Sequence, residues 1–418
     1  MVKIKIMKNK NNAIVIVGSS VAAVSAIEAV RSVNEDVSIT VVTKEKNIFY
    51  SRPLISYLNI TRKQFYYRDT DFFVKNKVRV MHGEVSEFKN GCVYLKKGKS
   101  ISYGKLILAT GGVPINPVIK GIDSRNVFSF TTYDDALKIK QNASGSKTAA
   151  VIGAGMIGIK AAEYLKDLGV SVSMIELLDK PFASVLDRNS GDIVARHIQK
   201  NIKLYLGRKV TEITGNVCVL DSGEKISSDI TVIAVGVVPN TTVAEKSGLK
   251  IGKGIIVNSF METSEKNVYA AGDCVESEDV LLCCKRVLPI WPVAREQGRI
   301  AGLNAVGVRT VYEGSFQMNS IDVFGLPIIT LGISNSDSPD FVVSSDIRAG
   351  KYKKIIVKDE RIIGAIFVGD INRSGIITGL IKDRIKVTGF REELVKDSFG
   401  YIYVPRISVS EKAVPVEI

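Results

Sequence analysis

The sequence holds few of the residues that build common metal and thiol centres. Only two of its 418 residues are histidines, His82 and His197, and they lie in unrelated segments. The five cysteines form no C-x-x-C or C-x-x-x-x-C pair, and the adjacent Cys283 and Cys284 would make only a strained disulfide. These scarcities argue against a histidine metal site, a dithiol redox centre and an iron–sulfur set. We expect no bound metal, two reduced loop thiols, and histidines that are structural or on the surface.

Long apolar runs and nucleic-acid-binding modules are missing as well. No apolar run reaches the roughly 18 residues of a membrane span, and the lysines near the start are not followed by a cleavable signal segment. These absences predict a cytoplasmic chain. The net charge of +14 would suit nucleic acid, but the basic residues are dispersed and no base-reading module accompanies the single tryptophan. We therefore expect no nucleic-acid partner. The charge either steers an acidic electron carrier or partner subunit, or reflects a lysine-rich solvated surface.

A glycine-rich turn after an apolar strand is the clearest motif that is present. Residues 151–158 read V-I-G-A-G-M-I-G, and a strand is predicted over 148–152. Gly153 permits the tight turn, Gly155 lets the backbone approach a diphosphate, and Gly158 lets the following helix pack closely on the strand. The N-terminus of that helix then offers N–H groups to the diphosphate.

An acidic residue follows at the expected place. A helix predicted over 159–168 leads to a strand predicted over 170–175, and Glu176 comes directly after it, 23 residues beyond Gly153. A carboxylate there accepts both ribose hydroxyls of NAD and repels the 2′-phosphate of NADP. Strand, glycines, helix, strand and acid in this order predict a dinucleotide site, against the alternative of a structural glycine turn.

The opening segment repeats this order with substitutions. Its expected elements are a strand over 13–17, a helix over 24–33 and a strand over 37–42. The turn begins at Gly18, but Ser20 and Ala23 occupy the second and third glycine positions, and Thr43 stands where an acid is usual. Serine is small enough for the close approach, and its hydroxyl can bond a phosphate oxygen. By itself this segment fits either a second dinucleotide site or an ordinary strand–turn–helix.

Two later strands end in small residues that suit a bound cofactor. Residues 105–112 read K-L-I-L-A-T-G-G, and residues 267–274 read N-V-Y-A-A-G-D-C. The carboxylate of Asp273, at the end of the second strand, is suited to a ribityl chain.

These four segments, in this order, resemble the FAD-dependent pyridine nucleotide–disulfide oxidoreductase superfamily, and the resemblance covers nearly the whole chain. Residues 49–54 (F-Y-S-R-P-L) and 291–298 (W-P-V-A-R-E-Q-G) narrow it to the rubredoxin-reductase and NADH-oxidase-like branch. The opening at Gly18 with Thr43 is similar to the FAD subunits of iron–sulfur oxidoreductase complexes, such as phenylglyoxylate dehydrogenase and tungsten aldehyde oxidoreductase. The implied fold is α/β, with two Rossmann-like dinucleotide-binding domains and a C-terminal α+β domain.

The resemblance implies positions for both cofactors. FAD is expected against residues of the first turn, the following loops and the two later strands, namely Gly18, Ser19, Ser20, Ala22, Ala23, Thr43, Lys44, Glu45, Arg52, Pro53, Val85, Ala109, Thr110, Gly111, Gly272, Asp273, Pro292 and Ala294. NAD(H), as substrate, is expected against the second turn and its neighbours, namely Gly153, Ala154, Gly155, Met156, Ile157, Gly158, Glu176 and Gly236.

Two departures from the family pattern bear on the chemistry. The disulfide reductases and peroxidases of the family carry a reactive cysteine in the segment that corresponds to residues 50–59, and this chain has none there. The branch usually has Glu two residues after the last glycine of the NAD motif, and this chain has Lys160. Lys160 is a candidate catalytic neighbour of flavin and nicotinamide, where a cation would stabilise developing negative charge; the alternative is a helix lysine that reaches solvent.

The motifs divide the chain. We expect an FAD-binding domain over 1–118 and 241–309, an NAD-binding domain over 119–240, and a C-terminal α+β domain over 310–418 that forms dimer or partner contacts.

The predicted function is an FAD enzyme that exchanges hydride with NAD and single electrons with an iron–sulfur protein or subunit. The alternatives are a free-standing NADH oxidase that reduces oxygen, and a structural subunit that retains FAD as packing.

Overall fold

The computed structural model describes residues 13–404, except 48–49, 59–64, 70, 337, 339–340 and 349. The chain forms two compact units, Met1–Leu178 with Ile202–Phe316 and Asp179–Asn201 with Gln317–Ile418. Residues 179–201, which the sequence analysis assigned to the middle domain, thus pack with the C-terminal residues. The three predicted domain boundaries stay a prediction.

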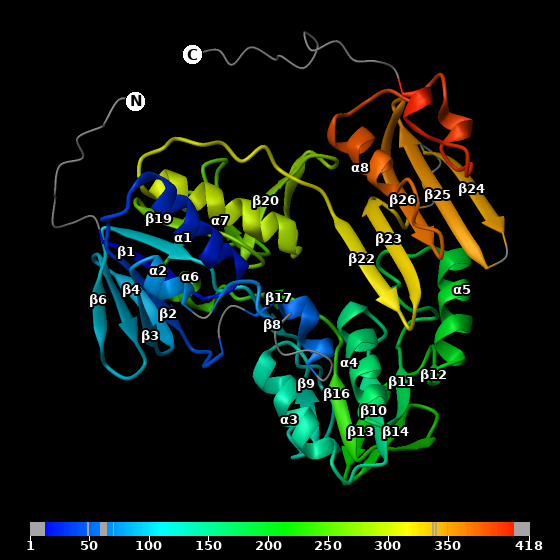
Figure 1. Ribbon diagram of the computed structural model, residues 1–418. Helices are drawn as coiled ribbons and strands as arrows, with labels where there is room; N and C mark the ends of the chain where they lie inside the picture. The colour runs from blue at the N-terminus through cyan, green and yellow to red at the C-terminus, as the bar shows by residue number, and fades with distance from the viewer. Residues whose placement is uncertain are drawn as a thin grey trace. The chain divides into compact units, whose positions relative to one another are not determined.

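The first unit contains a parallel sheet in the order β19-β7-β1-β2-β3. Its strands are β1 (Ile14–Val17), β2 (Ile39–Thr43), β3 (Val78–His82), β7 (Lys105–Leu108) and β19 (Val268–Ala270). All residues of β1 and β2 are buried, which explains why they read as unbroken apolar runs. Helices α1 (Val21–Val33) and α7 (Trp291–Ala305) pack side by side against this sheet (Figure 1).

Close packing of these two helices depends on glycine. A Cβ on Gly298 of α7 would lie 2.2 Å from the carbonyl oxygen of Ala22, and one on Gly302 would lie 2.5 Å from that of Ala26. Only glycine at these two positions lets the backbones of α1 and α7 approach so closely.

The same unit contains a second parallel sheet with the same plan, in the order β12-β11-β10-β16-β9. Its strands are β9 (Val127–Ser129), β10 (Thr148–Ile152), β11 (Ser171–Ile175), β12 (Lys203–Tyr205) and β16 (Ile230–Ile233), with helices α3 (Tyr133–Ala143) and α4 (Met156–Asp167). Each parallel sheet is accompanied by a three-stranded antiparallel sheet. These are β4 (Val85–Lys89), β5 (Cys92–Leu95) and β6 (Ser100–Ser102), and β13 (Val210–Thr214), β14 (Val217–Leu220) and β15 (Lys225–Ser227).

Smaller elements complete the first unit. They are the 3₁₀ helix η1 (Arg52–Tyr57), α2 (Phe72–Lys75), α6 (Thr242–Lys246), the antiparallel pair β8 (Gly112–Pro114) and β17 (Val237–Pro239), and the sheet of β18 (Ile255–Ile256), β20 (Val275–Asp279) and β21 (Cys284–Val287). Of these, η1 packs against both α3 and α4.

The second unit is built on an antiparallel sheet in the order β22-β23-β26-β25-β24. Its elements are α5 (Arg188–Gln199), β22 (Met318–Val323), β23 (Leu326–Gly332), β24 (Val342–Arg348), β25 (Lys351–Lys358), β26 (Arg361–Val368), α8 (Ser374–Lys382), η2 (Arg391–Glu393) and η3 (Tyr401–Tyr403). Neighbouring residues of a strand point to opposite faces. Lys354 pairs with Asp187 at the start of α5 (3.0 Å), whereas Lys353 pairs with Asp370 just before α8 (2.9 Å), so the two helices begin on opposite faces of the sheet.

The structure confirms the α/β class with two dinucleotide-type sheets and a C-terminal mixed domain. The predicted helices over 24–33 and 159–168 were wrong at their starts, because α1 begins at Val21 and α4 at Met156. In both cases the residues taken for the end of the turn form the first helical turn, which brings the helix N-terminus right up to the glycine position. Among the described residues, no helix is both long and apolar enough to cross a membrane.

Candidate functional site

The second glycine turn has open space where a diphosphate would sit. Gly153 has φ +107°, and a Cβ there would lie 2.5 Å from the carbonyl oxygen of Ala234. A Cβ on Gly158 would lie 2.0 Å from the carbonyl oxygen of Gly153, whereas one on Gly155 would meet nothing within 4 Å. Gly155 is also the N-cap of α4 and offers no side chain to the first N–H groups of the helix. These groups, which include those of Met156 and Ile157, therefore suit an anionic ligand.

Glu176 turns back onto this glycine turn. Its Oε2 accepts a hydrogen bond from the N–H of Ala154 (2.6 Å), and its Oε1 accepts one from the N–H of Leu178 (2.9 Å). The fold thus brings together an acid and a turn that the sequence separates by 22 residues. A carboxylate accepts about four hydrogen bonds, so two acceptor positions remain for ribose hydroxyls.

The first glycine turn has a similar backbone geometry, but serine and alanine occupy its second and third glycine positions. Gly18 has φ +119°, and a Cβ there would lie 2.0 Å from the carbonyl oxygen of Ala109. Ser20 is the N-cap of α1, and its side chain makes no capping hydrogen bond. The N–H groups at this helix start are therefore also left for a ligand, although Ala23 fills the third glycine position and is buried.

A pair of hydroxyls replaces the acid in the first unit. Ser19 Oγ lies 3.0 Å from Thr43 Oγ1, and Thr43 Oγ1 accepts the N–H of Glu45 at 3.2 Å. Thr43 is buried at the end of β2. Uncharged hydroxyls thus stand at the position where the second glycine turn is followed by a carboxylate, Glu176.

An arginine lies between two carboxylates beside the first turn. Arg52 forms an ion pair with Glu45, which also accepts the hydroxyl of Tyr50 at 2.5 Å, and donates to the carbonyl oxygen of Thr131 at 2.8 Å. Burial raises the pKa of Asp273, while the positive charge of Arg52 opposes that rise. Within the part of the chain that the structure describes, the Asp273 carboxylate has no hydrogen-bond partner. Because a desolvated carboxylate without donors is costly, the site fits a ligand rich in hydroxyl groups.

The first helix and the start of α7 meet at Gly272, the residue before this carboxylate. Gly272 has φ +87°, and a Cβ there would lie 3.3 Å from the Cβ of Ala22 and 3.6 Å from that of Ala294. The N–H of Gly272 donates to Oε1 of Gln297 at 2.8 Å, and Nε2 of Gln297 donates to Ser277 Oγ at 2.8 Å. Gln297 is fully buried and fixes the turn before Asp273. No sequence motif assigned it to the site, although it stands just before Gly298 in the W-P-V-A-R-E-Q-G motif, which marked this segment.

Several of the remaining predicted residues lie in connected loops of the first unit. Thr110 Oγ1 donates to the carbonyl oxygen of Asn240 at 2.7 Å, and the N–H of Asn240 donates to that of Gly111 at 2.8 Å. Gly236, with φ +122°, accepts the N–H of Ile115 at 3.0 Å. Other predicted contacts are Lys44 after β2, Pro53 in η1, Val85 at the start of β4 and Pro292 in the first turn of α7.

Lys160 joins the two halves of the site. Its Nζ lies 2.7 Å from Oε2 of Glu163 and donates to the hydroxyl of Tyr57 at 3.3 Å, above the Tyr57 ring. The Lys160 side chain is 15% exposed, so it does not reach freely into solvent. Burial lowers the pKa of Lys160, but the hydrogen bond and charge of Glu163 outweigh it and leave the pKa raised. The ammonium is therefore charged at neutral pH, one helical turn beyond the glycine turn.

All five cysteines are free thiols. Cys283 and Cys284 are both exposed; Cys283 lies in the turn between β20 and β21 as expected, whereas Cys284 is the first residue of β21. Cys274 follows Asp273 directly, but it is fully buried and its Sγ donates to the carbonyl oxygen of Ala271 at 3.4 Å. Burial raises the pKa of Cys274, which keeps it a protonated and unreactive thiol.

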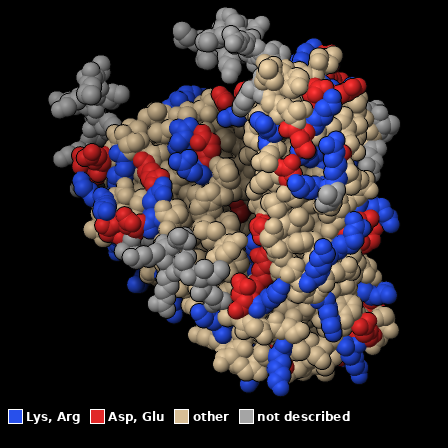
Figure 2. Space-filling model, turned by 45° about the vertical axis from the view of Figure 1, so that its right-hand side comes forward, with Lys and Arg blue, Asp and Glu red and all other residues tan. Residues whose placement is uncertain are grey.

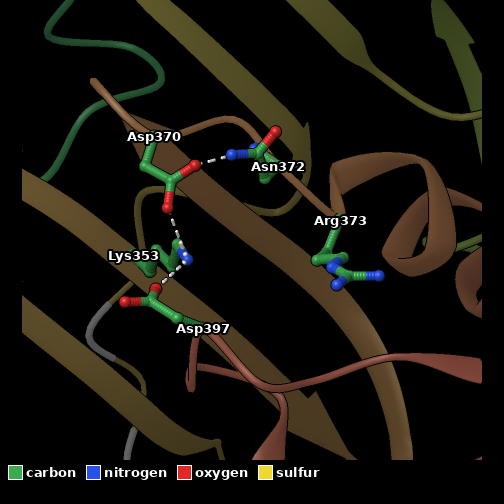
Figure 3. A pocket seen from close by; sticks show the side chains of 5 residues that line it. All are labelled: Lys353, Asp370, Asn372, Arg373 and Asp397. Carbon is green, nitrogen blue, oxygen red and sulfur yellow. Dashed lines mark hydrogen bonds and ion pairs between the residues drawn. The ribbon is translucent and has the colours of Figure 1, made fainter. Parts of the chain in front are cut away.

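The second unit has an open depression of about 510 Å³ that holds none of the predicted site residues (Figure 3). It is lined by Lys353, Asp370, Asn372, Arg373 and Asp397. Lys353 Nζ lies 2.9 Å from Asp370 and 2.7 Å from Asp397, so two carboxylates neutralise the buried ammonium. This polar depression differs from the mostly apolar clefts that hold cofactors.

The comparisons with known proteins agree with this geometry. Residues 12–298 match the family model "Pyridine nucleotide-disulphide oxidoreductase", and residues 318–385 match the "Rubredoxin NAD+ reductase C-terminal domain". The chain belongs to the pyridine nucleotide-disulphide oxidoreductase family. The predicted superfamily is thereby confirmed.

Relatives extend over nearly the whole chain. The ε subunit of NADH-dependent phenylglyoxylate dehydrogenase from Aromatoleum evansii is 31% identical over 91% of this chain and 94% of its own length. An NADH oxidase from Methanocaldococcus jannaschii is 34% identical over 71% of each chain. The crystal structure of NADH:rubredoxin oxidoreductase from Clostridium acetobutylicum superposes with a TM-score of 0.78 and 29% identity, covering 91% of this chain and 97% of that one.

Family membership establishes the cofactors and the general reaction. The protein is an NADH-dependent oxidoreductase that uses FAD. The unpaired Asp273 carboxylate, the open Gly155 turn and the uncapped starts of α1 and α4 fit two dinucleotides.

Proposed function

We propose that this protein takes hydride from NADH onto FAD and passes the electrons one at a time to an iron–sulfur protein or partner subunit. Flavin suits this role because it accepts two electrons and releases them singly. The absence of a thiol acceptor carries the proposal. The segment 50–59 contains no cysteine, and Cys274, the thiol nearest in sequence to Asp273, is buried and protonated. Electrons must therefore leave the flavin directly.

In this proposal the residues of the chain bind FAD and NADH and orient their rings, and none of the residues needs to act as an acid or base. The start of α4 holds the diphosphate of NADH and Glu176 holds its ribose, while the start of α1, Arg52 and Asp273 hold FAD. Hydride transfer depends on alignment of the two rings, and the predicted site residues given above are assigned to that task. Lys160 is proposed to place a positive charge near the two rings, where it would favour the electron-rich reduced flavin.

The relatives support an iron–sulfur acceptor without specifying it. One is named for its transfer to rubredoxin, and another is the ε subunit of a dehydrogenase. On the face shown in Figure 2, Lys and Arg are interspersed with Asp and Glu rather than gathered in one patch. We therefore propose that the partner docks through the C-terminal unit and dispersed basic side chains, in the cytoplasm. A homodimer and the absence of a nucleic-acid partner remain predictions.

The experiment compares acceptors across a salt series. Steady-state NADH oxidation is measured with rubredoxin, with a viologen dye and with oxygen. Rubredoxin turnover should exceed oxygen turnover and fall as salt rises, because exposed charges are screened over about 10 Å at 0.1 M. The viologen separates a docking effect from an effect on flavin reduction, since it needs no protein interface. Co-purification from the native host would then identify the partner.

A free-standing NADH oxidase is the second candidate, favoured by the relative from Methanocaldococcus jannaschii. This candidate would be supported if the turnover rate with oxygen exceeded the rate with every iron–sulfur acceptor and did not depend on salt. A structural, flavin-retaining subunit would show no bleaching of the flavin by NADH under anaerobic conditions.

A further inference from the structure

One phenol beside the FAD-binding residues is buried without a partner. Among the described residues, the hydroxyls of Ser56, Tyr67 and Tyr312 are buried and make no hydrogen bond. Buried tyrosine hydroxyls normally find a partner, because an unpaired one loses its hydration without compensation. Tyr312 is near Gln297 and Ser277, whose polar groups influence its hydroxyl. On Tyr67, by contrast, the described residues act only through the charges of Arg68, Glu28 and Arg52, and none of them forms a hydrogen bond with its hydroxyl.

Two contacts set the position of the Tyr67 ring. The Trp291 ring stands at 87° to it with ring centroids 5.0 Å apart, and the guanidinium of Arg68 lies 5.6 Å from its centroid. Arg68 is itself fixed by an ion pair of 2.6 Å with Glu28. Trp291 begins α7 and Glu28 lies on α1, so the two helices that pack at the first glycine turn set the direction of the phenol.

The phenol belongs to the same electrostatic neighbourhood as the unpaired carboxylate. The charge of Arg52 acts on both the Tyr67 hydroxyl and the Asp273 carboxylate. Burial raises the pKa of Tyr67, so the hydroxyl stays protonated and remains a donor across the neutral range. A buried donor and a desolvated acceptor around one arginine complement a ligand that carries both hydroxyl groups and acceptor oxygens. The flavin half of FAD has both.

We propose that Tyr67 donates a hydrogen bond to an oxygen of the flavin half of bound FAD, and that Trp291 and Arg68 position its ring. The sequence motifs assigned neither Tyr67 nor Trp291 to the cofactor. The assignment rests on the presence of FAD and is independent of the electron acceptor.

The test uses the holoenzyme and the single tryptophan of the chain. Trp291 is the only Trp, and flavin absorbs where tryptophan emits, so FAD beside it quenches its fluorescence. Diluting the holoenzyme releases FAD, and the recovery of Trp291 emission reports the release. The Tyr67→Phe variant keeps the ring and its contacts with Trp291 and Arg68, and removes only the hydroxyl.

The proposal predicts that Tyr67→Phe releases half of its FAD at a protein concentration about two- to tenfold higher than wild type. Asp273→Ala is the positive control, and its protein concentration at half release of FAD should lie further above that of wild type. Tyr103→Phe is the matched control, because Tyr103 also packs edge-on against a ring, that of Phe88 (6.4 Å), at the β4–β6 sheet. It should behave as wild type.

Three results would overturn the assignment. The first is FAD release by Tyr67→Phe at the wild-type concentration, which would make the hydroxyl irrelevant to the cofactor. The second is an equal loss in Tyr103→Phe, which would indicate a general effect of removing a phenol. The third is Trp291 emission that does not change as FAD leaves, which would place the Tyr67–Trp291 pair away from the flavin.

Discussion

The two dinucleotide units follow one plan, β1–α1–β2 and β10–α4–β11, but they differ where a ligand would touch them. After β11 a carboxylate, Glu176, turns back onto the glycine turn of Gly153 (2.6 Å to the N–H of Ala154). At the ends of β1 and β2 two hydroxyls, Ser19 and Thr43, occupy the corresponding place at 3.0 Å from one another. A carboxylate distinguishes a ribose from a phosphorylated ribose, whereas hydroxyls do not. Only the unit that must choose between NADH and NADPH needs the charge.

The third glycine position shows a second difference. Gly158 packs against its own turn, since a Cβ would lie 2.0 Å from the carbonyl oxygen of Gly153. In α1 the corresponding position holds Ala23. The close backbone contact of α1 is instead made by Gly298 of α7, which packs against the backbone of Ala22. Glycine is thus required where backbone meets backbone, and the motif position alone does not determine where that happens.

The largest effect is expected from the charge difference. Glu176→Gln keeps an acceptor for the Ala154 N–H but removes the negative charge. We expect the preference for NADH over NADPH, as a ratio of kcat/KM, to fall by about 10- to 150-fold, the range of a charged hydrogen bond. Thr43→Val, the corresponding change in the first unit, should leave this ratio unchanged. The comparison would fail if wild type reduced its flavin faster with NADPH than with NADH.

The third glycine position gives the next largest effect. Gly158→Ala should destabilise the protein by about 1–3 kcal/mol, because the added methyl group overlaps backbone that has little room to move. The reciprocal change, Ala23→Gly, should cost only about 0.5–1 kcal/mol through helix propensity. Urea unfolding followed by flavin fluorescence measures both. Equal losses of unfolding free energy in the two variants would mean that both turns tolerate a side chain at the third glycine position equally well.

The sequence predicted the parts of the site that lie close together along the chain. The local spacing predicted the strand before Gly153, the turn at Gly153 and the acid at Glu176. The repeated order of elements predicted the parallel sheets. The sequence could not indicate that Gln297 holds Gly272, since only the fold brings α7 to that turn. It also left Tyr67 unassigned, because the short aromatic run Phe65-Tyr66-Tyr67 in a loop has no pattern that distinguishes a ligand contact from core packing.

The smallest effect concerns the position two residues beyond the third glycine. In α4 this is Lys160, which faces Tyr57 of η1 and Glu163 (2.7 Å). In α1 it is Ser25, which is buried in the core. A half-buried cation beside the two cofactors would favour the electron-rich reduced flavin, so its loss should slow flavin reduction by NADH.

We expect Lys160→Gln to slow anaerobic bleaching of the flavin by NADH by about two- to tenfold, a modest electrostatic loss at a partly solvated site, with FAD retention unchanged. The double variant with Glu163→Gln separates the missing cation from a carboxylate left without its partner. Because it removes both charges, its bleaching should stay slow if the cation matters and recover if only the stranded carboxylate does. Ser25→Ala in the first unit is the matched control and should bleach at the wild-type rate. Stopped-flow absorbance of the flavin measures all four proteins, and a wild-type rate for Lys160→Gln would assign Lys160 to holding η1 against α4.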